Sequence, residues 1–469
     1  MLLERFYDED LAQASYLIGC QATGEAVVVD PRREVQVYLD TAAKNGMRIV
    51  AVTETHIHAD YLSGTRELAH VTGAEAYVSG EGGVDWQYGF DATRLFDGDV
   101  IQVGNIRLAA RHTPGHTPEH LVFLVTDGAL TDDPGYLLSG DFVFVGDLGR
   151  PDLLDEAAGG KDTRFQGAQD LFDSLKNVLL ALPDHVQIHP AHGAGSACGK
   201  ALGAIASTTV GYERLYTWWG PYLAADDRDG FVRELLDGQP DAHAYFARMK
   251  RENRDGPAVL GPLPNLEAVT AQDAAARAAD GDAVLVDTRA AADVRAGTVP
   301  GALAIPATGK TAAWGAWAID PEREQRPLLL LVEDHEQAEH VRDHLIRVGI
   351  DTTAGYFTSL DGIETAPSET IAPDQIADLD EPFLLDVREM SEYHAGHIPG
   401  ATRIGAGRVL WETSRLPRDR TIVSYCQSGA RNIVAAQALR RAGFPVIEVD
   451  GSYLGYARMQ QHANAGAER

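Results

Sequence analysis

Two histidines and an aspartate at alternate positions, His56, His58 and Asp60, form a compact cluster of metal-ligand residue types. They follow an apolar run, residues 48–53, with the composition of a buried strand. Loops at strand ends are where α/β proteins place ligands and chemistry. Neutral imidazoles and carboxylates suit Zn, Fe or Mn. The cluster therefore predicts a metal site at the end of this strand.

Matching residues occur at three later strand ends. His116 lies in 113–117, Asp141 ends Ser-Gly-Asp over 139–141, and His192 closes a strand over 187–193. Because loops on one rigid sheet converge on one site, we expect these side chains to meet the first cluster. This agreement disfavours the alternative that 55–61 is simply a polar loop.

A second constellation centres on Cys426, which lies between an apolar run, 421–425, and a helix predicted from Asn432. Backbone N–H groups in such a loop form an anion-binding nest at the positive end of the helix. That setting favours a thiolate or a persulfide anion. The sequence predicts Cys426 as a sulfur-carrying nucleophile, with substrate contacts from the rest of the loop: Gln427, Ser428, Gly429, Ala430 and Arg431.

The second half of the chain contains an internal repeat. Leu-Val-Asp-Thr-Arg at 285–289 recurs as Leu-Asp-Val-Arg at 385–388, and Ala-Gly-Thr-Val-Pro-Gly-Ala at 296–302 recurs at 395–401. Each copy alternates helices and strands, which predicts a small parallel α/β sheet. In the first copy Val332 occupies the place of Cys426. Valine cannot carry sulfur, so we expect that copy to be inactive.

Proline and glycine punctuation divides the chain into three predicted domains, 1–256, 265–362 and 370–465. The first is predicted to alternate strands and helices, with helices over 35–45 and 63–72 and a hairpin over 95–108. Residues 211–255 are predicted to be mainly helical and to cover the sheet, and the alternative is that their aromatic side chains are ordinary core residues.

The net charge and the cysteine count indicate which partners and which cellular compartment suit the protein. A net charge of −29 and a pI near 4.8 disfavour nucleic acid and anionic membranes. Three cysteines cannot build a disulfide framework, and a reducing cytoplasm fits best. We expect no signal peptide and no membrane span, because no apolar stretch approaches ~18 residues. We also expect a homo-oligomer.

The pattern His56-x-His58-x-Asp60-Tyr61, with the pieces ending in His116, Asp141 and His192, resembles the metallo-β-lactamase superfamily. The resemblance implies an αββα sandwich within an α/β fold class. Two relatives compete. Glyoxalase II-type hydrolases hold two metals and use a histidine after the motif aspartate, where this chain has Tyr61, a poor replacement ligand. Persulfide dioxygenases hold a single Fe(II).

The persulfide dioxygenase resemblance implies one Fe(II) on His56, His116 and Asp141, with zinc as the alternative. Two histidines and one carboxylate leave open positions at which iron binds O₂ and substrate side by side. The remaining motif residues are then predicted to orient the ligands, or to retain a weak second metal site: His58, Asp60, Tyr61 and His192.

Two further residues carry weaker predictions. Arg150 could bind the carboxylate of a thiol carrier or pair with Asp152. Cys198, in a glycine-rich turn, resembles a cysteine in the version of this domain that is fused to rhodanese repeats, and the resemblance implies a role in shaping or modulating persulfide handling. The alternative for Cys198 is a small buried side chain.

Residues 370–465 resemble rhodanese, a sulfurtransferase, and 265–362 resemble an inactive rhodanese copy. A similar Cys-x₅-Arg loop occurs in tyrosine phosphatases, but here four residues separate Cys426 from Arg431, and the upstream motifs are those of rhodanese. The two resemblances together imply oxidation of a low-molecular-weight persulfide of glutathione, coenzyme A or another thiol by O₂. Sulfite and thiol are the expected products, with Cys426 forming or using thiosulfate in sulfide detoxification. The alternatives are a zinc thioester hydrolase with a sulfur-carrier tail and a non-catalytic persulfide sensor.

Overall fold

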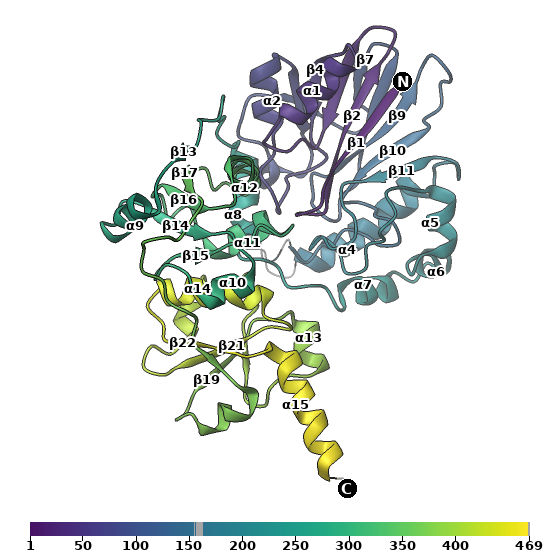
Figure 1. Ribbon diagram of the computed structural model, residues 1–469. Helices are drawn as coiled ribbons and strands as arrows, with labels where there is room; N and C mark the ends of the chain where they lie inside the picture. The colour runs from purple at the N-terminus through teal and green to yellow at the C-terminus, as the bar shows by residue number, and fades with distance from the viewer. Residues whose placement is uncertain (154, 156–162, 468–469) are drawn as a thin grey trace. The chain divides into compact units, whose positions relative to one another are not determined.

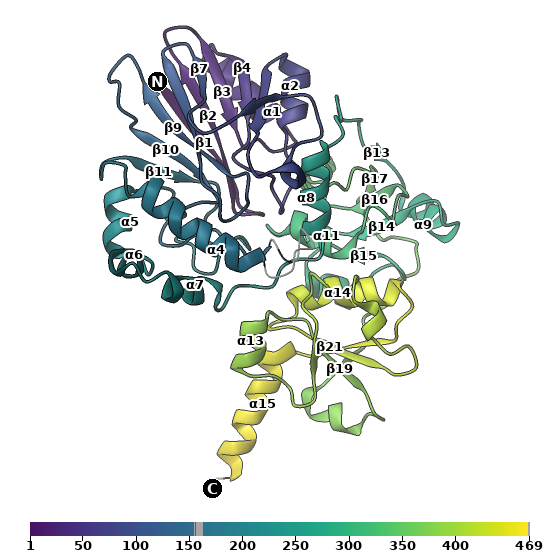
Figure 2. The same ribbon diagram turned by 180° about the vertical axis from the view of Figure 1, so that it is seen from behind.

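A computed structural model describes residues 1–153, 155 and 163–467 of the chain, shown in Figures 1 and 2. The chain forms two compact units. The first contains Met1–Ala242 and Phe246–Leu263, and the second contains His243–Tyr245 and Pro264–Arg469. No helix among the described residues is long and apolar enough to cross a bilayer.

The first unit contains two six-stranded sheets. The first sheet consists, in spatial order, of β1 (Leu2–Asp8), β2 (Gln13–Cys20), β3 (Glu25–Val29), β4 (Arg48–Thr53), β5 (Glu75–Ser79) and β6 (Thr93–Leu95). The second consists of β12 (Thr208–Thr209), β11 (Gln187–Pro190), β10 (Tyr136–Gly140), β9 (Leu121–Asp127), β8 (Ile106–His112) and β7 (Val100–Val103).

A shared hydrophobic core joins the inner faces of these sheets. One cluster of buried side chains draws on β2, β3 and β4 of the first sheet and on β7 to β10 of the second. The burial patterns explain this packing, because β7 alternates exposed and buried positions while β2 is buried throughout. Alternation places one face on the core, and continuous burial means that both faces are covered.

Helices cover the outer faces of both sheets (Figure 1). The first sheet packs on α1 (Gln36–Lys44) and α2 (Thr65–Thr72). The second packs on α4 (Thr163–Ser174), its π-helical continuation Leu175–Leu179, α5 (Val210–Tyr216), α6 (Gly220–Ala225) and α7 (Arg228–Leu236). A short 3₁₀ turn, Val84–Trp86, and α8 (Phe246–Asp255) complete the unit. The predicted αββα sandwich is confirmed.

Strand direction gathers the motif loops at one edge of this sandwich. β8 and β10 are both antiparallel to β9, and β11 is parallel to β10, so β8, β10 and β11 end on the same side. His116, Asp141 and His192 follow these three ends. The His56 loop follows β4 in the facing sheet.

The second unit contains two five-stranded parallel sheets with equivalent strand orders. The first is β13 (Glu267–Ala268), β17 (Thr353–Phe357), β16 (Leu328–Leu331), β14 (Val284–Asp287) and β15 (Leu303–Ala304). The second is β18 (Thr370–Ile371), β22 (Val446–Val449), β21 (Ile422–Tyr425), β19 (Phe383–Asp386) and β20 (Thr402–Arg403). The two predicted parallel sheets are confirmed.

Helices connect the strands of each repeat. In the first they are α9 (Ala271–Ala279), α10 (Ala291–Ala296), α11 (Thr311–Ala318) and α12 (His335–Arg347). In the second they are α13 (Met390–Ala395), α14 (Ala430–Arg441) and α15 (Ser452–Ala467), with 3₁₀ turns at Pro373–Asp378 and Thr413–Arg415. Helix α14 packs against α10, α11 and β15, so the repeats share an interface along this helix.

Candidate functional site

His56, His116 and Asp141 meet in the buried interior of the first unit. The Nε2 atoms of His56 and His116 lie 3.9 and 3.5 Å from Oδ2 of Asp141. Their ligand atoms all lie within 4.8 Å of one another, as a shared metal ion requires. Neither carboxylate oxygen of Asp141 has a hydrogen-bond partner, although the residue is fully buried. Because a buried carboxylate without partners is costly, this donor set fits a cation.

Hydrogen bonds orient the imidazoles toward this point. His116 donates from Nδ1 to the Arg150 carbonyl at 3.0 Å, and His56 Nδ1 lies 2.9 Å from Thr55 Oγ1. A carbonyl only accepts, so His116 carries its proton on Nδ1 and presents the Nε2 lone pair to the cluster. Burial, with the neighbouring histidines, lowers the pKa of His56, and burial lowers that of His116. The neutral form that binds metal is therefore favoured.

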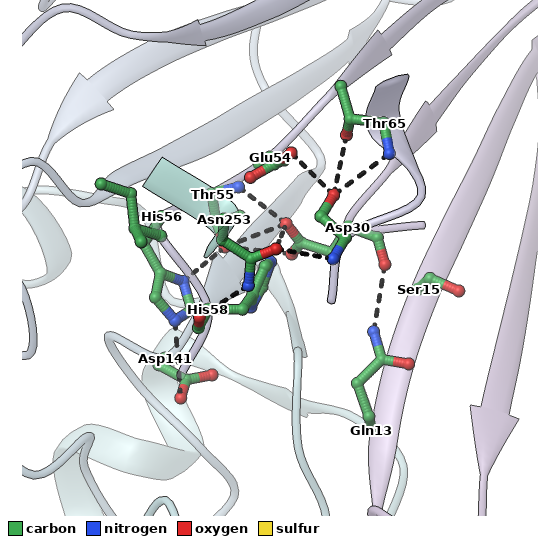
Figure 3. A network of polar contacts seen from close by, with 12 residues as sticks. Gln13, Ser15, Asp30, Glu54, Thr55, His56, His58, Thr65, Asp141 and Asn253 are labelled. Carbon is green, nitrogen blue, oxygen red and sulfur yellow. Dashed lines mark hydrogen bonds and ion pairs between the residues drawn. The ribbon is translucent and has the colours of Figure 1, made fainter. Parts of the chain in front are cut away.

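Asp30 fixes the motif loop, and the sequence analysis missed this role. Its carboxylate accepts from the backbone N–H of Thr55 at 2.7 Å and lies 3.1 Å from Nε2 of His58 (Figure 3). Asp30 has a φ of 55°, a conformation that non-glycine residues rarely adopt. This backbone turns the chain immediately after β3 and brings the carboxylate under the motif. The sequence feature that could have indicated Asp30 is its position directly after the apolar strand β3.

Asn253 of α8 closes the loop from the other side. Its amide donates to the carbonyls of His58 and Tyr61, both at 2.7 Å, and its Oδ1 accepts from the Ser63 N–H at 2.8 Å. The residue is buried, and Figure 3 shows its side chain beside His58. No local pattern marks Asn253 in the sequence, because its partners lie some 190 positions away.

His120 is a further residue that the sequence analysis missed. Its ring stacks on that of His56 with the centroids 5.0 Å apart, and its Nε2 accepts from the backbone N–H of Asp141 at 3.1 Å. Thr113 Oγ1 lies 2.9 Å from the Nδ1 atom of His120. His120 thus braces one ligand and fixes the backbone of another.

Tyr61 is held away from the metal-ligand cluster. Its hydroxyl donates to the Asp30 carbonyl at 3.1 Å and accepts from Gln13 at 3.2 Å. Burial raises the pKa of Tyr61 well above its ordinary value, which keeps the phenol protonated. His58 directs Nε2 at Asp30, while its buried Nδ1 has no partner.

A second group of ligand types, Asp60, His192 and Cys198, adjoins the first. His192 Nε2 lies 3.5 Å from Asp60 Oδ2 and 3.5 Å from Asp141 Oδ1, so the Asp141 carboxylate reaches both groups. The ligand atoms of Asp60, His192 and Cys198 lie within 4.8 Å of one another. Burial raises the pKa of Cys198, which favours the neutral thiol in the metal-free protein. The structure therefore places Cys198 beside the predicted orienting residues.

The guanidinium of Arg150 is buried and bonded within the protein, so it is not presented to a thiol carrier. The residue is 1% exposed. Its guanidinium donates to both carboxylate oxygens of Asp152 and to the Ala197 carbonyl at 3.0 Å. The ion pair with Asp152, which the sequence left open, is the one formed.

The Cys426 loop joins β21 to α14 in the second repeat. The buried Cys426 sulfur accepts from the backbone N–H of Gly429 at 3.0 Å. Gly429 has a φ of 105° and forms the N-cap of α14 without a side-chain capping bond. The first turn of α14 thus keeps backbone N–H groups that no capping side chain occupies, as an anion site at a helix terminus requires.

Arg431, a predicted substrate contact, is paired with Glu392. Its two terminal nitrogens donate to the two carboxylate oxygens of Glu392 at 2.6 and 2.7 Å. Arg388 reaches the loop instead, donating to Gln427 Oε1 at 3.0 Å while the Asp386 carboxylate holds it in place. Most of the positive charge around the loop is therefore already paired.

Two family models match the chain. The metallo-beta-lactamase superfamily model matches residues 8–192, and the rhodanese-like domain model matches 372–459. A solved metallo-beta-lactamase from Staphylococcus aureus subsp. aureus COL is 37% identical, with 76% of this chain and 99% of that chain covered and a TM-score of 0.68. This chain belongs to the metallo-β-lactamase superfamily. It also carries a C-terminal rhodanese-like domain.

Relatives within this superfamily have two kinds of named activity. Persulfide dioxygenase ETHE1, mitochondrial, from Bos taurus is 29% identical over 41% of this chain and 68% of its own length. A hydroxyacylglutathione hydrolase from Nitrosococcus oceani is 30% identical over 41% of this chain and 66% of its own. Superfamily membership supports an enzyme with a metal site. It does not separate persulfide dioxygenase from hydroxyacylglutathione hydrolase activity, so the choice between them depends on the residues around the site.

Proposed function

We propose that the protein is an Fe(II)-dependent persulfide dioxygenase coupled to a rhodanese sulfurtransferase. The observation that carries this proposal is the set of two imidazoles and one carboxylate at His56, His116 and Asp141, with Tyr61 bonded elsewhere. When bound by such a set, Fe(II) supplies open positions for O₂ and a persulfide. The similarity to the Bos taurus persulfide dioxygenase supports the same activity.

The proposed overall reaction is RSSH + O₂ + H₂O → RSH + SO₃²⁻ + 2H⁺. The S–S bond breaks, O₂ oxidises the terminal sulfur to sulfite, and the thiol carries away the remaining sulfur. The protein's contribution is positional. Asp30, Asn253 and His120 hold the ligands in place, and burial of the cluster excludes bulk water.

The proposed rhodanese reaction uses Cys426. A persulfide on Cys426 transfers its terminal sulfur to sulfite: Cys-S-S⁻ + SO₃²⁻ → Cys-S⁻ + S₂O₃²⁻. The reverse reaction takes sulfur from thiosulfate. The Gly429 N–H and the end of α14 stabilise the anionic sulfur in both directions. Sulfite, the expected product of the metal site, is the sulfur acceptor in this reaction.

Metal content and O₂ uptake test the iron proposal. We expect anaerobically purified full-length protein to hold about one Fe(II) per chain and to consume O₂ with glutathione or coenzyme A persulfide. His116→Ala should lower metal affinity and O₂ uptake by about 100-fold or more, because even the loss of a residue behind a ligand can cost 10–100-fold. His112→Ala is the matched control, since His112 binds the Pro118 carbonyl outside the cluster. Protein with iron but without persulfide-dependent O₂ uptake would overturn the proposal.

A zinc thioester hydrolase is the second candidate. The cluster of Asp60, His192 and Cys198 beside Asp141 favours it, because these residues offer ligands for a second ion. The hydroxyacylglutathione hydrolase relative supports this candidate. Two zinc ions per chain, loss of one in Cys198→Ser, and thioester hydrolysis without O₂ uptake would establish it.

We also propose that the substrates are small thiol persulfides in a reducing cytoplasmic compartment, and that the protein forms a homo-oligomer. The described cysteines are all free, which suits a reducing compartment. Light scattering of the purified chain tests the oligomer, and a monomer at micromolar concentration would contradict it.

A further inference from the structure

Arg295 of the first repeat reaches the Cys426 loop of the second. It belongs to α10, and its Nη2 donates to the Gly429 carbonyl. Its Nε donates to Oε2 of Glu448 at 2.9 Å. The guanidinium also lies against Gly429, because a Cβ added there would be 2.9 to 3.2 Å from its atoms. A repeat without a sulfur-carrying cysteine thus supplies a side chain to the loop of the other repeat.

The contact fixes the peptide that joins Gly429 to Ala430. In a trans peptide the C=O and the N–H point in opposite directions. The Gly429 carbonyl accepts from Arg295 and from the N–H of Ile433, one turn into α14. The Ala430 N–H is therefore directed back toward the N-terminal end of the helix, where the Cys426 loop lies.

Glycine makes this anchoring necessary. Gly429 has a φ of 105°, which only glycine adopts readily, and glycine also tolerates the alternative backbone conformations. Rotation of the 429–430 peptide would turn a carbonyl, in place of an N–H, toward an anionic sulfur. A cationic donor on the carbonyl disfavours that rotation, because a charge-assisted hydrogen bond would be lost.

Glu448 holds Arg295 in place from inside the second repeat. It is 1% exposed and accepts from Arg440 and from Asn432, each at 3.1 Å. Arg440 and Asn432 both belong to α14, the helix that Gly429 begins. The buried carboxylate therefore ties the arginine to the helix whose first peptide it orients.

The arginines of the second repeat are committed to other partners. Arg431 is paired with Glu392, and Arg388 with Asp386. Neither donates to the Gly429 carbonyl in the described contacts. The inactive repeat thus supplies the arginine that holds this carbonyl.

We propose that Arg295 is a positioning residue for sulfur transfer at Cys426, and that the first repeat is retained because it holds this residue in place. The inference rests on the proposed rhodanese activity. Arg295 acts on the backbone of the loop, and through it on the N–H groups that face the thiolate and the persulfide. The active sulfurtransferase is then the pair of repeats, with each repeat supplying part of the site.

Arg295→Gln in the full-length chain tests this assignment. We expect kcat for thiosulfate:cyanide sulfur transfer to fall about tenfold or more, as the loss of a charge-assisted hydrogen bond predicts. The pH dependence of Cys426 alkylation by iodoacetamide should shift to higher pH, because the thiolate loses a preoriented hydrogen-bond donor. A purely structural role would lower the amount of folded protein without moving this profile. O₂ uptake with glutathione persulfide should stay unchanged.

The matched control is Arg277→Gln. Arg277 lies on α9 of the same repeat and pairs with the exposed Glu267 and Asp273. It should leave kcat and the alkylation profile unchanged. Arg295→Lys keeps a charge but cannot serve both acceptors, so it should recover part of the loss. It also serves as the test variant if the glutamine variant misfolds.

Two outcomes separate this inference from the proposed function. If the unaltered protein shows no Cys426-dependent sulfur transfer, the proposed function fails. If transfer is present, and the glutamine and lysine variants both keep kcat and the alkylation profile of the unaltered protein, the inference fails while the proposed function stands.

Discussion

The two repeats of the second unit have the same sheet order but opposite designs at one helix terminus. In the first, Asp334 caps α12 by accepting from the Gln337 N–H at 2.9 Å. In the second, Gly429 caps α14 without a side-chain bond, and its N–H faces the Cys426 sulfur. The first repeat fills its anion site with its own carboxylate, and the second leaves the site for sulfur.

The two repeats differ at more than one residue of this loop. Val332 occupies the cysteine position, and Glu333 and Asp334 follow it with two negative charges. The Asp-x-Arg pair is kept in both copies, as Asp287–Arg289 and Asp386–Arg388. The pair is therefore present with or without the cysteine, and the loop before the helix is where the two copies differ.

Cys426→Ser should produce the largest difference. We expect sulfur transfer to thiosulfate or cyanide to be abolished, because serine cannot carry sulfane sulfur. O₂ uptake at the metal site should continue at the rate of the unaltered protein. Paired assays on one preparation measure both activities. Loss of O₂ uptake in this variant would show that the metal site depends on Cys426.

Asp386→Ala and Asp287→Ala should differ in their effects on stability. Removing Asp386 leaves Arg388, which is 1% exposed, as a buried unpaired charge, at a cost of about 3–5 kcal/mol. The Arg289 side chain is 31% exposed and can be hydrated, so Asp287→Ala should cost about 1–3 kcal/mol. Hydrogen exchange of the β19 and β14 amides measures each repeat separately. Equal destabilisation by the two substitutions would contradict this expectation, because it would show that the burial of the arginine does not determine the cost.

Val332→Cys should produce the smallest change. Combined with Cys426→Ser, it should give no more sulfur transfer than Cys426→Ser alone. The reason is that the Asp334 carboxylate already occupies the α12 N-terminus and repels an anionic sulfur. Assays of thiosulfate:cyanide transfer on the double variant measure this. Recovered turnover would show that the cysteine alone separates the two repeats.

Much of the architecture could be predicted from local patterns. Alternating and continuous apolar runs indicated the strands of the sandwich, and the recurring Asp-x-Arg segments indicated two parallel sheets. Such periodicities lie within one element and need no long-range information. The predicted helices over 35–45 and 63–72 correspond to α1 and α2, and the predicted hairpin corresponds to β7 and β8.

The side-chain partners at the sites could not be predicted in the same way. The sequence indicated Arg431 as a substrate contact of the sulfur loop, but it did not indicate the ion pair with Glu392, which lies 39 positions away. The sequence allowed Arg150 to bind either a thiol carrier or Asp152, and the fold buries it against Asp152. Because a guanidinium pairs with whichever carboxylate the fold brings near, its role depends on neighbours that no local motif names.

By itself the sequence determined the residue types that can do chemistry: the candidate metal ligands His56, His116 and Asp141, and the thiol of Cys426. It also determined that Val332 removes that thiol from the first repeat. Only the tertiary structure decided how these groups are held, through Asp30 and Asn253 at the metal cluster and Arg295 at the sulfur loop. The physical reason is sequence separation: Asn253 and Arg295 act on residues more than a hundred positions away, and folding alone brings them together.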